Sequence, residues 1–117
     1  MAGLARATSA TAQLAGPAAA AMPLGPWALA TCLVALGEEA LLRGALLDAF
    51  EARLGLPWAV VLTSAAFALM HVPLYGWQVV PLDLGAGLWF AGLRLVTGGT
   101  AAPVVAHALA DLATYWL

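Results

Sequence analysis

Two long stretches of this sequence carry no charged side chain, and they limit the fold more than any other feature. One stretch covers residues 7–37, and the other covers residues 54–82, where the single histidine is the neutral His71. A helix that spans a membrane needs about 20 consecutive apolar residues, and both stretches exceed that length. The sequence therefore predicts helices that lie within a lipid bilayer.

The overall composition indicates the same environment. Hydrophobic residues make up 64% of the 117-residue chain and charged residues only 9%, whereas a soluble domain is about 25% charged. The formal net charge is −2 and lysine is absent, which argues against a nucleic-acid partner because such a partner needs a basic face. Cys32 is the only cysteine, so an intramolecular disulfide is excluded. We expect one integral membrane domain in contact with lipid.

The pattern of apolar segments and breaks predicts an all-α fold, a polytopic membrane helix bundle of about four core helices. The expected helices cover residues 24–52, 57–72, 81–97 and 100–117. Pro73 disfavours helical geometry at the residue before it, so the second helix is expected to end beside His71. Thr100 is the expected N-cap of the fourth helix. Residues 1–23 are expected to form an N-terminal arm or a weak extra hydrophobic segment, and residues 24–117 the core.

The first predicted helix carries three charged side chains inside an apolar segment, where charges are costly. Glu39 precedes Arg43 by four positions, so the two side chains share one helix face in the order that favours an ion pair. Glu38 is rotated by about 100° from Glu39 and has no cation on its own face. A solvated helix end is the alternative interpretation of this segment.

The two histidines of the chain lie on two other predicted helices. Phe67 and His71 are one helical turn apart, and His107 and Asp111 are four positions apart on one face. A buried structural histidine, or a structural His–Asp hydrogen bond, would explain either pair alone. Together with the glutamates, these side chains are suited to activating water in a secluded site. Asp83 is instead expected to be structural, at the positive end of the third helix.

The order of these segments resembles the motifs of the CPBP family of intramembrane proteases. That family includes the CAAX prenyl endopeptidases, the Abi-type proteins and the myxosortase-like processing enzymes. Its motifs EExxxR, FxxxH and Hxxx(N/D) appear here as EEALLR at residues 38–43, FALMH at residues 67–71 and HALAD at residues 107–111. The resemblance spans residues 38–111 and implies a membrane-embedded endopeptidase.

The resemblance also implies roles for the motif residues. Glu38 would be the general base that activates water, with His71 beside it, and the Glu39–Arg43 pair would support the site. We expect Glu38, His71 and His107 to converge in space, because no other ionisable residues occupy three separate helices in this way.

The third motif would stabilise the oxyanion of the reaction through His107 and Asp111. The family often has asparagine at the last position, and an ionised aspartate cannot donate a hydrogen bond to an oxyanion. Either Asp111 is protonated, or it orients His107 instead.

The resemblance is compatible with a metal-dependent and with a glutamate-based reaction. In a metal-dependent enzyme, Glu38, His71 and His107 would hold zinc, which accepts nitrogen and oxygen ligands. The HExxH pattern is absent, and Arg43 would repel a cation. The sequence therefore favours a glutamate mechanism without a cofactor.

The predicted function is cleavage of a peptide bond near the membrane, in a C-terminal tail, a leader or a sorting signal. The expected partners are membrane lipid and a peptide or protein substrate. One alternative is a non-catalytic membrane immunity or partner-binding protein of the same fold, and another is a haem carrier that uses both histidines. The bias toward Ala, Leu, Gly and Arg without lysine suggests a GC-rich bacterial source, and so a multi-pass protein of a bacterial inner membrane.

Overall fold

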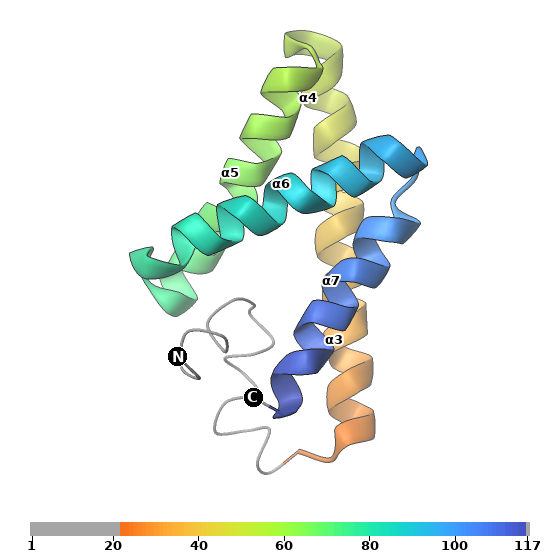
Figure 1. Cartoon of the computed structure of the whole chain (residues 1–117), viewed down its shortest axis with the longest axis vertical. Helices are drawn as coiled ribbons and strands as arrows, with labels where there is room; N and C mark the ends of the chain where they lie inside the picture. The colour runs from red at the N-terminus through yellow and green to blue at the C-terminus, as the bar shows by residue number, and fades with distance from the viewer. Residues whose placement is uncertain (1–21, 117) are drawn as a thin grey trace.

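The computed structural model describes residues 22–116, and every regular element in that part of the chain is helical (Figure 1). In chain order the elements are α3 (Leu24–Glu39), the π-helix η2 (Ala40–Leu46), α4 (Leu47–Leu54), α5 (Leu56–Tyr75), the 3-10 turn η3 (Trp77–Val79), α6 (Val80–Thr97), α7 (Ala101–Ala113) and the 3-10 turn η4 (Thr114–Trp116). The predicted all-α bundle of four core helices is confirmed. The arm predicted over residues 1–23 lies, except for its last two residues, outside the described part.

The first core helix is one continuous rod over residues 24–54, close to the predicted 24–52. Its middle seven residues form the π-helix η2, which the sequence analysis did not predict. A π segment inside an α-helix is rare and is frequently found at functional sites. The rod ends at Gly55, whose φ of +84° lies in the region that favours glycine.

Helix α5 is longer than predicted. The expected end at residue 72 is wrong, because the helix continues through Pro73 to Tyr75. A proline removes only its own N–H from the helix ladder, and one further turn follows before the true end at Gly76. The φ of Gly76 is +83°, and its N–H still donates to the carbonyl of Val72 at 2.7 Å.

The start of α7 agrees with the prediction in position but not in chemistry. Thr100 occupies the N-cap position, yet its side chain makes no capping hydrogen bond. Its carbonyl instead accepts the N–H of Val104 at 3.0 Å. The turn before it begins at Gly98, which ends α6 in a left-handed conformation.

The helices are arranged so that the middle of the bundle is enclosed from several sides. The rod and α5 form a hairpin at the α4 end, α6 crosses in front of them, and α7 runs back alongside α3 (Figure 1). Helices α6 and α7 share the Gly98-Gly99 turn and diverge from it. Residues from α3, η2, α5, α6 and α7 can therefore meet at one place.

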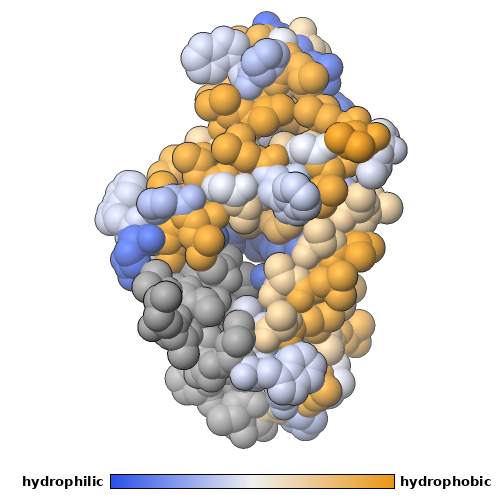
Figure 2. Space-filling view, in the orientation of Figure 1, coloured by the Kyte–Doolittle hydropathy of each residue, from blue (hydrophilic) through white to orange (hydrophobic). Residues whose placement is uncertain are grey.

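The outer surface is apolar, as a lipid environment requires. Helix α5 and the segment Trp77–Thr97 are long and apolar enough to cross a membrane. Large apolar side chains such as Leu29, Trp89 and Leu109 are more than 60% exposed, and hydrophobic residues cover most of the visible face in Figure 2. These faces can remain exposed without cost only against lipid.

A small apolar core that contains two phenylalanine rings lies next to the charged residues. Leu42 of η2, Phe67 of α5 and Phe90 of α6 form a buried cluster. The rings of Phe67 and Phe90 meet edge to face with centroids 5.9 Å apart, an arrangement that aromatic pairs prefer. The guanidinium of Arg43 lies 4.8 Å and 5.4 Å from the two ring centroids. The apolar core and the charged site are therefore adjacent.

Candidate active site

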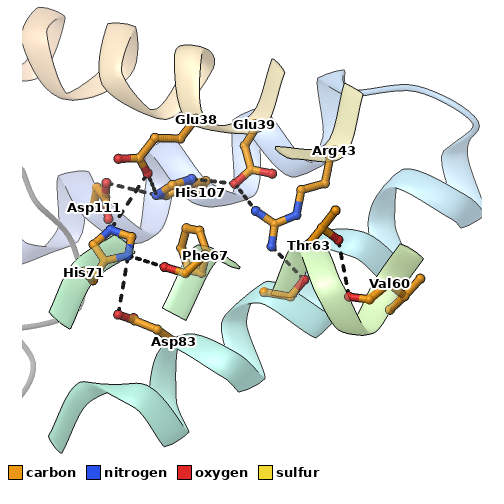
Figure 3. Close-up of polar contacts among 11 residues, drawn as sticks. Glu38, Glu39, Arg43, Val60, Thr63, Phe67, His71, Asp83, His107 and Asp111 are labelled. Carbon is orange, nitrogen blue, oxygen red and sulfur yellow. Dashed lines mark hydrogen bonds and ion pairs between the residues drawn. The ribbon is translucent and has the colours of Figure 1, made fainter. Parts of the chain in front are cut away.

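The three motif segments converge in the middle of the bundle (Figure 3). Glu38 comes from α3, His71 from α5 and His107 from α7. The Oε2 atom of Glu38 lies 4.0 Å from Nε2 of His71 and 3.6 Å from Nε2 of His107. The predicted convergence is confirmed by these distances.

Glu39 forms the predicted ion pair with Arg43 and also reaches a third helix. Its Oε1 accepts a hydrogen bond from Nη1 of Arg43 at 3.0 Å, and Nδ1 of His107 lies 2.8 Å from the same oxygen. Glu39 and Arg43 are both fully buried, so the alternative of a solvated helix end is wrong for this pair. An ionised carboxylate only accepts hydrogen bonds, so Nδ1 of His107 carries a proton and donates it to Glu39.

The other side of the Arg43 guanidinium binds α6. Its Nη2 donates to the carbonyl of Gly87 at 2.8 Å. A Cβ atom at Gly87 would lie 3.0 Å from Cα of Ser64 and 3.1 Å from Nη2 of Arg43, closer than ordinary van der Waals contact. Glycine at this position therefore lets α5 and α6 approach each other and lets Arg43 reach the α6 backbone.

The π-helix is itself held by α6. Nε of Arg94 donates to the carbonyl of Arg43 at 3.1 Å, and Nη2 of Arg94 lies 3.3 Å from Oδ1 of Asp48. The side chain of Asp48 is 62% exposed, so this ion pair is screened by solvent. The hydrogen bond to the Arg43 carbonyl is the contact that links α6 to the irregular segment.

The tautomer of His71 follows from its backbone contact. Nδ1 of His71 lies 2.7 Å from the carbonyl oxygen of Phe67, and a carbonyl can only accept. Nδ1 therefore carries the proton, and Nε2 of the neutral ring has a free lone pair. That lone pair is on the nitrogen nearest to Glu38.

Asp111 lies beside the ring of His107. Its Oδ2 is 3.3 Å from Nε2 of His107, the nitrogen that is also near Glu38. This position fits an aspartate that orients the His107 ring, which is one of the two roles left open by the sequence. The role itself stays a prediction.

Asp83 lies in the first turn of α6, as expected from the sequence. Its side chain is also buried against the site. Its Oδ2 lies 3.7 Å from Nδ1 of His71, and both side chains are only 1% exposed (Figure 3). The spacing of Asp83, Gly87 and Phe90 places all three on one buried face of α6, and that pattern was available in the sequence.

A cavity of about 190 Å³ adjoins the cluster between α6 and α7. Asp83, His107 and Asp111 lie on its wall together with apolar side chains such as Ala86 and Phe90. Figure 2 shows hydrophilic atoms at the bottom of the hollow between these two helices. The cavity offers space for a substrate group directly beside His107.

The side chains that could hold a metal ion lie close to a buried cation. Among residues 22–116, no three His, Cys, Asp or Glu side chains are grouped closely enough to hold one. Nδ1 of His107 donates a hydrogen bond to Glu39, and the guanidinium of Arg43 binds the same carboxylate. A positive ion would therefore enter a site that already contains a buried cation.

The comparisons with known proteins agree with the motifs. Residues 20–113 match the model of the family described as type II CAAX prenyl endopeptidase Rce1-like. No curated protein and no solved structure matches the chain. The family match covers most of the sequence and includes all three motifs. The chain therefore belongs to the Rce1-like family of membrane-embedded CAAX-type proteases, as the sequence resemblance predicted.

Proposed function

We propose that this member of the Rce1-like family is an endopeptidase in which Glu38 activates the attacking water. One observation carries the proposal: of two adjacent glutamates, Glu39 is bound by Arg43 and His107, while Glu38 faces the Nε2 atoms of both histidines. A carboxylate that already accepts two charged hydrogen bonds is a poor base. Glu38 makes only the longer contacts of 4.0 Å and 3.6 Å to the two histidine nitrogens, and its side chain is 12% exposed, so water can reach it.

The first step is attack by water on the carbonyl carbon of the peptide bond. The separation of 4.0 Å between Oε2 of Glu38 and Nε2 of His71 is too long for a direct hydrogen bond and suits a bridging water. Glu38 takes one proton from this water while the water oxygen bonds to the carbonyl carbon. General base catalysis of this kind contributes roughly 10²–10⁴-fold to a rate.

The negative charge that develops on the carbonyl oxygen needs a donor, and His107 is suited to this role. Its Nδ1 donates to Glu39, so a proton on Nε2 makes the ring a donor toward the oxyanion. The carboxylates of Glu39 and Asp111 then lie on either side of the ring and offset its positive charge. In this assignment Asp111 orients His107 and does not donate to the oxyanion itself.

The last step breaks the carbon–nitrogen bond. The proton held by Glu38 passes to the departing nitrogen, so that the first products are a carboxylic acid and an amine. The second proton of the water is still on the carboxylic acid, and it passes to the amine or to solvent when that acid ionises. No metal ion takes part in this proposal.

The substrate that we propose is a protein segment presented at the membrane: a C-terminal tail, a leader or a sorting signal. Three observations support it: the family name refers to CAAX prenyl substrates, the cavity beside His107 is mainly apolar, and the outer surface is suited to lipid. We further propose that the protein crosses a bacterial inner membrane several times.

The experiment compares three proteins purified in the same detergent: the wild type, Glu38→Gln and Glu51→Gln. Glu51 lies on α4 in an exposed position, so Glu51→Gln makes the same chemical change outside the site. The probes are a quenched fluorescent peptide with a farnesylated CAAX-type tail and a mixture of unmodified peptides analysed by mass spectrometry.

We expect the wild type and Glu51→Gln to cleave a probe at equal rates and Glu38→Gln to be at least about 100-fold slower. Equal cleavage by Glu38→Gln would contradict the role of Glu38. A wild type that cleaves neither set of probes would favour the non-catalytic alternative.

A further inference from the structure

Asp83 is a buried carboxylate for which the three family motifs provide no role. Asp83 is 0% exposed, and neither of its carboxylate oxygens has a hydrogen-bond partner among the described residues. A buried charge without partners destabilises a fold, and in a membrane protein such a residue usually marks a functional site. Within the described part of the chain, its Oδ2 lies 3.7 Å from Nδ1 of the His71 ring.

The geometry places Asp83 and Glu38 at opposite nitrogens of the His71 ring. Nδ1 donates to the Phe67 carbonyl at 2.7 Å and lies 3.7 Å from Oδ2 of Asp83. Nε2 lies 4.0 Å from Oε2 of Glu38. Asp83 comes from α6 and His71 from α5, so this contact also fixes the ring relative to a second helix.

We propose that Asp83 is a positioning residue for His71. Its carboxylate holds the Nδ1 edge of the ring so that Nε2 points at Glu38, and it offsets the positive charge of the ring whenever Nε2 holds a proton. The proton comes from the attacking water through Glu38 and returns to Glu38 before the amine leaves, while Asp83 neither gains nor loses a proton. A carboxylate behind a histidine has this function in the serine protease triad. The inference rests on the proposed function, since it requires Glu38 to activate water beside His71.

The proposal predicts that removing the charge of Asp83 lowers the catalytic rate without lowering the thermal stability. Asp83→Asn keeps the shape of the side chain but removes an unpaired buried charge, so the thermal stability should stay equal or rise. The catalytic rate should nevertheless fall, because the ring loses its counter-charge. A purely structural role would lower stability and activity together.

The kinetic test measures kcat, KM and the melting temperature, using whichever peptide probe the wild type cleaves. The proteins compared are the wild type, Asp83→Asn, Asp83→Glu and the control Asp48→Asn. Asp48 is exposed, and its ion pair is with Arg94 and not with His71, so Asp48→Asn should behave like the wild type. We expect Asp83→Asn to lower kcat by about tenfold or more with KM unchanged, and Asp83→Glu to recover part of the loss. Unchanged kcat would overturn the proposal. A raised KM at constant kcat would also overturn it, because Asp83 lines the cavity and would then act on the substrate.

A second measurement does not depend on proteolysis. The chain contains two histidines, so ¹⁵N-histidine NMR gives two sets of ring signals, which His107→Gln assigns. Asp83→Asn should shift the ring nitrogens of His71 and leave those of His107 in place. If the wild type cleaves no probe, the proposed function fails, and unmoved His71 signals would separately refute the contact. If Asp83→Asn does not fold, Asp83→Glu is used for both measurements. An Asp83→Glu variant with the kcat of the wild type and unmoved His71 signals would then overturn the proposal.

Discussion

Oε1 of Glu39 and Nδ1 of His107 lie 2.8 Å apart, although 68 positions separate the two residues in the chain. The same oxygen accepts the guanidinium of Arg43 at 3.0 Å. Through this single atom the first motif fixes both the position and the tautomer of the third-motif histidine. These two contacts tie Glu39 to the structure of the site, which supports the proposal that Glu38 is the base.

Replacement of Glu39 by glutamine should mainly affect stability. The change leaves the buried Arg43 without its counter-charge, and breaking a buried pair in this way costs roughly 3–5 kcal/mol of unfolding free energy. Part of the cleavage activity should remain at low temperature, because Glu38 is intact. Unfolding in detergent and peptide cleavage by Glu39→Gln and Glu38→Gln measure both effects. A stable, inactive Glu39→Gln beside a fully active Glu38→Gln would reverse the assignment of the two glutamates.

The sequence predicted the features that depend on short spacings. The Glu39–Arg43 pair and the shared face of His107 and Asp111 both follow from the helical repeat, and the uncharged stretches determined the fold class. The convergence of Glu38, His71 and His107 was predicted because no other ionisable residues occupy three separate helices in this way. The family motifs then gave each residue a candidate role.

The sequence did not predict the features that depend on packing between helices. The π-helix at Ala40–Leu46 has no known composition signal, and it is held by Arg94 from a distant helix. The second hydrogen bond of Glu39 requires α7 to lie beside α3. Asp83 was assigned by its position in the first turn of α6, and only the packing of α6 on α5 turns that position toward His71. Pro73 did not end α5, because the chain allows one more turn before Gly76.

The close approach of α5 and α6 predicts a strong position dependence among the glycines of α6. Gly87→Ala would place a Cβ 3.0 Å from the backbone of Ser64, and overpacking of this kind costs about 1–3 kcal/mol. Gly85→Ala is the matched control, because a Cβ there meets nothing within 4 Å and alanine favours a helix by about 1 kcal/mol. Melting temperatures in one detergent should therefore fall for Gly87→Ala and stay equal or rise for Gly85→Ala. Equal melting temperatures for the two variants would contradict the close packing.

The two contacts of Arg94 should contribute unequally. Arg94→Met removes both the hydrogen bond to the Arg43 carbonyl and the exposed ion pair with Asp48, and it should lower the unfolding free energy by about 1 kcal/mol, since the side chain is partly exposed. Asp48→Ala removes only the exposed ion pair and should change it by less than about 0.5 kcal/mol. Denaturant titration of both variants measures the difference. A larger loss for Asp48→Ala would show that the ion pair, and not the hydrogen bond to η2, holds the C-terminal part of α6.

The proposed reaction needs no metal, so proteolysis should survive strong chelation. The purified protein would be incubated with EDTA and 1,10-phenanthroline, freed of chelator and assayed for kcat/KM, with a zinc protease treated in parallel to show that chelation is effective. We expect unchanged activity and no stoichiometric zinc by elemental analysis, because the buried guanidinium of Arg43, which binds Glu39 beside His107, disfavours a second cation at the site. His71→Gln and His107→Gln should then be slow enzymes whose metal content equals that of the wild type. The glutamate mechanism would be refuted by three results together: the wild type binds one equivalent of zinc, the two histidine variants lose it, and added zinc restores activity. A residue that is a metal ligand loses the metal when it is replaced.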